Sequence, residues 1–186
     1  MTLRLLAASA AAITLALTTP TFAADDAAPA SNADSIAQDT YNIMSAMMDF
    51  FNDAFARAGI EEEKTKATLM ARIDASIADY LNERNQDAFL QTYTADFSSE
   101  SRARVEIFFD TPEGQELFGS LPVNTDVVVP LTAENMTHEE HVDLMDAIVT
   151  HLRNESNGKR GLAKRADRLA DAIHELDQEL LTSITN

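Results

Sequence analysis

Cysteine is absent from this chain of 186 residues. Without it the fold has no disulfide, no thiolate ligand for a metal and no cysteine nucleophile. A G-x-S-x-G nucleophile motif is also missing, and the acidic residues are too many for a catalytic pair to be picked out. The sequence therefore predicts a protein that is not an enzyme, with no cofactor; an enzyme of an unrecognised type is the last alternative.

Basic residues are few, with 14 lysines and arginines against 31 acidic residues, which gives a formal net charge of −17. Such a surface repels nucleic acid and anionic lipid, so neither a nucleic-acid partner nor stable membrane insertion is expected. The only basic cluster is Lys164, Arg165 and Arg168, which we expect to pair within the chain. An acidic surface can also attract cations or basic partners weakly.

The N-terminal residues have the pattern of a secretory signal peptide. Arg4 precedes an apolar run from Leu5 to Leu17, and Thr21-Phe22-Ala23 offers a small-x-small cleavage site. The run is too short to span a membrane comfortably. We expect residues 1–23 to be removed after Ala23, residues 24–33 to form a disordered leader, and the protein to be periplasmic or secreted. Export without cysteine fits a bacterial periplasm.

Residues 34–186 are predicted to form one domain, an all-α bundle of about six helices. Apolar residues at helical spacing indicate helices over 34–58, with Asp34 as N-cap, and over 61–84, 86–96, 98–110, 137–154 and 159–183. Ser98 or Ser99 is expected to cap the fourth of these helices, and Thr137 with Glu140 to form a capping box at the start of the fifth. Asn85 is expected to end the second helix, and Gly59 to follow the first as its C′ residue. Two prolines and a run of three consecutive valines predict an irregular loop near 121–136.

The stretch FFDTPEGQELF, residues 108–118, is predicted to be a corner between two helices. Pro112 disfavours helix at Thr111, so Thr111 is expected to cap a new helix with Pro112 in its first position. Gly114 would allow a close approach of another helix or a ring. A phosphate-binding loop would need several glycines and a lysine, which this stretch lacks.

This corner is similar to the central motif of the DUF2059 family of exported bacterial proteins of unknown function. The matching residues are Phe108, Phe109, Thr111, Pro112, Gly114, Gln115 and Leu117. The family often has tyrosine at the second aromatic position, where this chain has Phe109. The resemblance covers about 98–122 closely and about 86–152 loosely, and it implies an all-helical fold and a periplasmic location without assigned catalytic residues.

Two groups of residues suggest metal binding. His138 and His141 lie one helical turn apart, on a face that also carries Met145, and two imidazoles of this kind could form half of a zinc or copper site. The pattern is one residue short of H-E-x-x-H, and a third ligand, such as His174, would be needed. The alternative is that both histidines flank the core and bond to the preceding loop.

Met44 and Met47 form a Met-x-x-Met pair that could hold Cu(I) through thioethers, although core packing is favoured because both lie in the centre of the apolar arc. Leucine, isoleucine and alanine at spacings of four and three in 162–180 predict a seam of about three heptads. We favour packing of this seam inside the bundle, with a homo-oligomer through 162–184 as the alternative.

The favoured function is binding or scaffolding of another envelope protein. Seven methionines and nine phenylalanines stand against only five glycines, on long amphipathic helices. Methionine and phenylalanine side chains adapt to apolar segments of a partner, so a groove rich in both is expected. Metal binding is the first alternative function.

Overall fold

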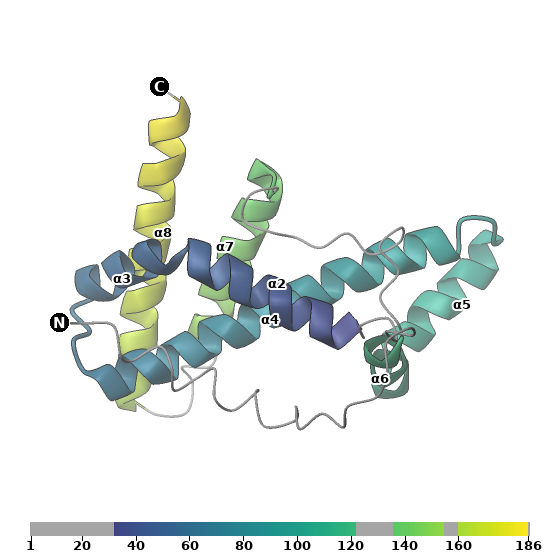
Figure 1. Cartoon of the computed structure of the whole chain (residues 1–186), viewed down its shortest axis with the longest axis horizontal. Coiled ribbons are helices and arrows are strands. Elements are labelled where there is room, and N and C mark those ends of the chain that lie inside the picture. Colours follow the sequence, from purple (N-terminus) through teal and green to yellow (C-terminus); the bar gives the residue numbers. More distant parts are fainter. Residues whose placement is uncertain (1–31, 122–135, 155–159, 186) are drawn as a thin grey trace, which may run out of the picture.

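The computed structural model describes residues 32–121, 136–154 and 160–185, and these ranges form seven helices without a strand. In chain order the helices are α2 (Asn32–Ala46), α3 (Met48–Arg57), α4 (Glu63–Tyr93), α5 (Ser99–Phe109), α6 (Pro112–Ser120), α7 (His138–Asn154) and α8 (Arg160–Thr185). The longest helix, α4, runs along the long axis of the molecule (Figure 1). The all-α fold is confirmed.

Most of the apolar core lies in one region, which we call the body: α2, α3, α7, α8 and the part of α4 before residue 86. In it α2 packs on α4, α7 packs on both α4 and α8, and α3 packs on α8. Each helix supplies residues spaced three and four apart, so that one stripe is removed from water. The fully buried side chains include Ile43, Phe51, Leu69, Ile77, Leu144 and Leu169.

The remaining region is smaller, and we call it the end lobe: residues 86–121, comprising the end of α4, α5 and α6. In Figure 1 it lies at the right of the molecule, where α5 and α6 pack on each other beside the end of α4. Its buried core is Leu90, Phe109 and Phe118, with Phe89, Val105 and Leu121 partly buried around it. Most of the helix surface in this lobe therefore faces solvent.

The predicted first helix is wrong in two details. Asn32 and Ala33 already lie in α2, so Asp34 sits in the first turn and is not the N-cap, and the leader does not extend to residue 33. The helix is also interrupted at Met47, which separates α2 from α3. The interruption lets α2 lie on α4 while α3 lies on α8, and tertiary packing thus overrides a continuous sequence pattern.

The predicted break at Asn85 is also wrong, because α4 continues through it to Tyr93. Asn85 is completely buried. Asparagine has only a modestly low helix propensity. The good helix formers around Asn85 and the packing of α4 against its neighbours therefore decide whether the helix continues. The two predicted helices 61–84 and 86–96 are therefore one rod that joins the body to the end lobe.

Several predicted helix ends are confirmed. Gly59 has a φ of +63° and follows Ala58, the C-cap of α3, as expected for a C′ glycine. The Ser98 hydroxyl accepts a hydrogen bond from the Ser101 backbone at 3.3 Å. At the start of α7, the Glu140 carboxylate accepts from the Thr137 backbone nitrogen at 2.9 Å. The Thr137 hydroxyl accepts from the Glu140 backbone nitrogen at 3.2 Å, which completes a capping box.

The seam of α8 packs into the body for most of its length. Ala166, Leu169 and Ile173 are buried, and Leu162 and Leu176 pack against the core, whereas Leu180 is 41% exposed. Residues 1–23, 24–31 and most of the Val/Pro loop lie outside the described residues, so the leader and loop predictions stay predictions. Within the described ranges no helix is both long and apolar enough to cross a membrane.

Candidate functional site

The corner between α5 and α6 is formed by the motif residues themselves. The Thr111 hydroxyl accepts a hydrogen bond from the Gly114 backbone nitrogen at 3.2 Å and donates one to the Phe108 carbonyl at 2.6 Å. Pro112 occupies the first turn of α6, where its missing N–H is not needed. The helix α5 thus ends and α6 begins at the predicted residues.

Gly114 is required because the two helices meet backbone to backbone. A Cβ atom at this position would lie against the Phe108 carbonyl oxygen and 2.6 Å from the Phe109 Cα. Backbone atoms cannot move aside as the end of a flexible side chain can. The close approach expected at Gly114 is confirmed, and the neighbour is the backbone of α5.

Three amide side chains tie this corner to α4. The Phe109 carbonyl accepts hydrogen bonds from Gln115 Nε2 at 2.8 Å and from Gln86 Nε2 at 3.3 Å. Asn82 Nδ2 in turn donates to Gln115 Oε1 at 3.3 Å. Gln115 therefore holds the end of α5 and also contacts α4, which fixes the orientation of both short helices.

The seven motif residues divide into two groups in the structure. Phe109 and Gly114 are buried, and Thr111, Pro112 and Gln115 cap the helix, start it or anchor the corner. Phe108 and Leu117 do none of this and are 42% and 44% exposed. Their side chains are available to another molecule.

Phe108 belongs to a continuous group of aromatic rings, which we call the aromatic cluster. Its members are Phe89, Tyr93, Phe97, Phe108, Phe109 and Phe118. Phe89 and Tyr93 stack with centroids 5.5 Å apart, and Tyr93 meets Phe97 at the same distance. Phe89 also contacts Phe109 at 5.9 Å, and Phe109 contacts Phe108 at 5.4 Å. Such ring pairs stabilise one another beyond the area they bury.

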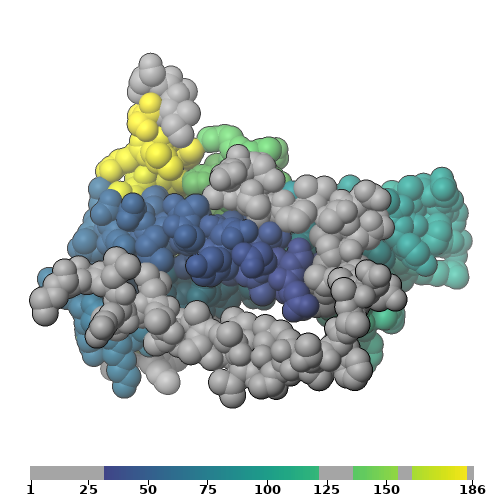
Figure 2. Space-filling view, in the orientation of Figure 1, coloured from purple at the N-terminus to yellow at the C-terminus, as the bar shows by residue number. Residues whose placement is uncertain are grey.

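The aromatic cluster passes from the core of the end lobe to its surface. Phe118 is almost fully buried, whereas Tyr93, Phe97 and Phe108 are 56%, 40% and 42% exposed. We call these three exposed rings the aromatic patch. In Figure 2 the teal end of the molecule, which carries part of this lobe, projects to the right beyond the other described helices. Ile107 and Leu117 add further exposed apolar side chains to the same lobe.

The sequence contained a signal for this cluster that the predicted helix break concealed. Leu81, Asn85, Phe89, Tyr93 and Phe97 follow one another at intervals of four residues. In one continuous helix, residues four apart are neighbours, so Phe89 and Tyr93 stack. A helix starting at residue 86 also places Phe89 and Tyr93 together but gives no reason for the exposure of Tyr93.

The two predicted histidines have different surroundings. His138 is exposed at the first residue of α7. His141 is partly buried, and its Nε2 lies 2.6 Å from Oδ1 of the buried Asp177. This contact joins α7 to α8 and is not the expected bond to the preceding loop. His174 is exposed on α8.

No group of three histidine, cysteine or carboxylate side chains within metal-binding distance occurs in the described ranges. Met44 is buried in the core and Met47 packs against it, as the packing interpretation predicted. These two methionines belong to the body, whereas the exposed rings belong to the end lobe. They therefore do not line one groove together. Metal binding stays a prediction.

A second polar group lies between α2, α4 and α7. Asp39 is 4% exposed, and this burial raises the pKa of its carboxyl to about 6, although the nearby Arg84 acts to lower it. Arg84 Nε lies 3.1 Å from Oε1 of Glu140. The pKa of Glu140 is lowered, first by its hydrogen bond from the Thr137 backbone. These groups connect three helices, so we assign them to the stability of the body.

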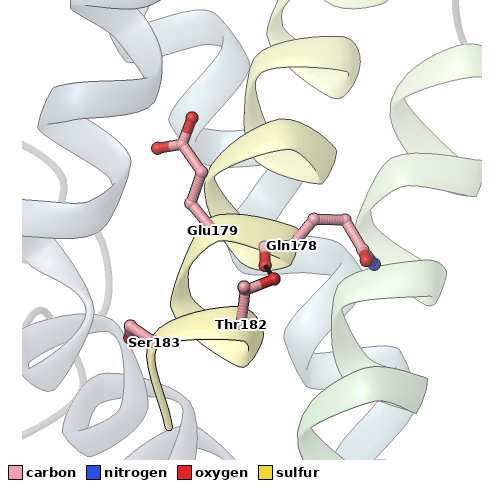
Figure 3. A pocket seen from close by; sticks show the side chains of 4 residues that line it. All are labelled: Gln178, Glu179, Thr182 and Ser183. Atoms are coloured by element: carbon pink, nitrogen blue, oxygen red, sulfur yellow. Dashed lines mark hydrogen bonds between the residues drawn. The ribbon is translucent and has the colours of Figure 1, made fainter. Parts of the chain in front are cut away.

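Figure 3 shows a hollow on one face of α8, lined by Gln178, Glu179, Thr182 and Ser183. The Thr182 hydroxyl donates to the Gln178 carbonyl within the helix at 2.8 Å. All four side chains are exposed and come from a single helix. The hollow therefore lacks the converging polar groups of a small-molecule site.

A scan against protein-family models and searches of curated proteins and of solved structures find no match to this chain. The site must therefore be interpreted from its own geometry. The aromatic patch is a feature of the described residues that packing within the chain does not explain.

Proposed function

We propose that this protein is a non-enzymatic component of the bacterial envelope that binds an apolar segment of another protein at the aromatic patch. The observation that carries the proposal is the course of the aromatic cluster, which starts at the buried Phe118 and ends in three exposed rings. Large exposed aromatic side chains are characteristic of interaction surfaces, where they supply much of the binding energy.

The surrounding architecture supports a binding role. The corner hydrogen bonds through Gln86 and Gln115 hold α5 against α4, so Phe108 is presented from a fixed backbone. A surface that is held in place before binding loses less conformational entropy on association. Phe108 can therefore contact a partner without first being ordered.

The proposed location rests on the sequence. The pattern of residues 1–23 and the resemblance of residues 108–117 to the DUF2059 motif both favour export. We expect the mature protein to begin at Ala24 and to fractionate with the periplasm. N-terminal sequencing of the protein from fractionated cells checks this, and an intact N-terminus in the cytoplasmic fraction would contradict it.

A photocrosslinking experiment tests the binding role. A benzophenone amino acid is introduced in place of Phe97 in the patch or, as the matched control, in place of Tyr41, which is 66% exposed on α2 outside the end lobe. After irradiation of intact cells, we expect a discrete protein adduct from position 97 and none from position 41. Adducts of equal yield at both positions, or none at either, would contradict the proposal.

A further inference from the structure

The charge of the end lobe indicates what kind of segment the aromatic patch would bind. Residues 86–121 contain no lysine and only two basic residues, Arg102 and Arg104. The same residues contain seven carboxylates, all exposed: Asp87, Asp96, Glu100, Glu106, Asp110, Glu113 and Glu116. The exposed rings thus stand in a strongly acidic part of the surface.

Internal pairing does not neutralise this charge. Arg104 forms an ion pair with Glu100 at 2.6 Å, and Arg102 donates to the Thr94 carbonyl at 3.2 Å. Both arginines are therefore engaged within the lobe. None of the other six carboxylates makes an ion pair with the described residues. Their mutual repulsion is relieved when a cationic group approaches.

Both the negative charge and the exposed rings of the end lobe favour binding of a cationic side chain. Lysine and arginine are attracted to carboxylates, and they also bind the faces of aromatic rings through cation–π interactions. Asp96 adjoins Phe97 in the sequence, and Asp110 follows Phe108 by two residues, so the exposed rings and the carboxylates come from the same segments of the end lobe. An acidic segment or an anionic lipid surface would be repelled.

We infer that the partner segment is cationic and amphipathic: large apolar side chains pack on Tyr93, Phe97 and Phe108, and lysine or arginine side chains reach the surrounding carboxylates. This inference rests on the proposed binding function and specifies the chemistry of its partner. A second copy of this chain is a poor occupant, because its net charge of −17 opposes the approach of another acidic surface.

The test uses the mature full-length protein and two labelled 18-residue helical peptides. One contains leucine and lysine in an amphipathic pattern, and the other has glutamate at every lysine position. Fluorescence anisotropy measures binding at low and at physiological salt. We expect the lysine peptide to bind at least tenfold more tightly than the glutamate peptide, with an affinity that falls as salt rises.

Variants separate the contributions of rings and charges. The ring variant Tyr93→Ala with Phe97→Ala is compared with Tyr41→Ala. The charge variant Glu106→Gln with Asp110→Asn is compared with Asp49→Asn and Asp53→Asn, two exposed acids on α3. We expect about a tenfold loss of affinity in the ring variant, a smaller loss in the charge variant, and no change in either control. Circular dichroism confirms that each variant is folded.

The outcomes distinguish this inference from the proposed function. Equal binding of both peptides, abolished by the ring variant, would overturn the cationic partner while supporting the aromatic binding surface. Binding of the lysine peptide that the ring variant leaves unchanged would show general attraction to an acidic protein and would overturn the inference. Failure of both peptides to bind would overturn it as well, while an adduct at position 97 in cells would still support the binding function.

Discussion

The body and the end lobe use apolar residues in opposite ways. In the body, twenty-two buried side chains, mostly aliphatic, come from five helices and the connection between α3 and α4, and they form one core. In the end lobe, three buried residues form the core, and much of the aromatic surface is exposed. Buried apolar area is the main source of stability, so the body supplies most of the stability of the fold.

The comparison separates a structural role from a binding role within one chain. The body has few exposed large apolar residues, since Tyr41 and Leu180 are the ones found in its described helices. Five others, including Tyr93 and Phe108, belong to the much shorter end lobe. The shared helix α4 allows this division, because its first part is held in the body while its last turns present Tyr93.

The largest effect on stability is expected from a core truncation in the body. Leu144 on α7 is completely buried, and Leu144→Ala should lower the free energy of unfolding by about 2–5 kcal/mol through lost burial and the cavity left behind. Phe97→Ala in the aromatic patch should change it by about 0.5 kcal/mol or less, as exposed substitutions do. Urea denaturation followed by circular dichroism measures both. Similar losses in the two variants would show that the patch is part of the stabilising core.

An intermediate effect is expected at the corner of the end lobe. Gly114→Ala places a methyl group against the backbone of Phe108 and Phe109, so it should cost about 1–3 kcal/mol through overpacking. Gly119→Ala is the matched control in the same helix, because a Cβ there meets nothing within 4 Å. It should stabilise by about 0.4–1 kcal/mol by restricting the unfolded chain.

Hydrogen exchange shows where the Gly114 effect acts. We expect Gly114→Ala to increase amide exchange in α5 and α6 more than in α7, because the small core of the lobe allows it to open locally. Equal denaturation midpoints for Gly114→Ala and the parent would mean that α5 and α6 do not meet as closely as described.

Local rules predicted the helix ends better than they predicted the path of the chain. The caps at Ser98, Thr111 and Thr137 depend on hydrogen bonds to residues three positions away, so the sequence alone contains the necessary information. The continuity of α4 through Asn85 depends on packing against distant residues. The helix propensity of a single residue contributes too little free energy to decide whether the helix continues.

The same distinction applies to the candidate site. The sequence predicts a corner between two helices at Pro112, and the structure contains it. That Phe108 and Leu117 would be exposed while Phe109 is buried could not be predicted, because it depends on how α5 and α6 pack on α4. The pairing of His141 with Asp177, 36 residues apart, likewise requires the tertiary structure.

The smallest of the three effects concerns the buried carboxyl of Asp39 in the body. The pKa of Asp39 is about 6 in the folded protein because of its burial, against 3.8 as its ordinary value. The folded state thus binds a proton more tightly than the unfolded state, so this group favours folding at acidic pH, and its contribution is lost as pH rises through 6. Between pH 5 and pH 7.5 the loss should be about 1 kcal/mol by linkage.

Asp39→Asn removes this titration, so the difference in unfolding free energy between parent and variant should shift by about 1 kcal/mol in favour of the variant as pH rises from 5 to 7.5. Charged groups near Asp39 affect how far its pKa is raised. Arg84 on α4 opposes it, and Glu140 on α7 is paired with Arg84. Asp49→Asn on the exposed face of α3 is the control and should shift the difference little. A parent–variant difference that stays constant over this range would show that Asp39 is hydrated in solution, and the body would then contain a wet polar gap where α2 meets α4.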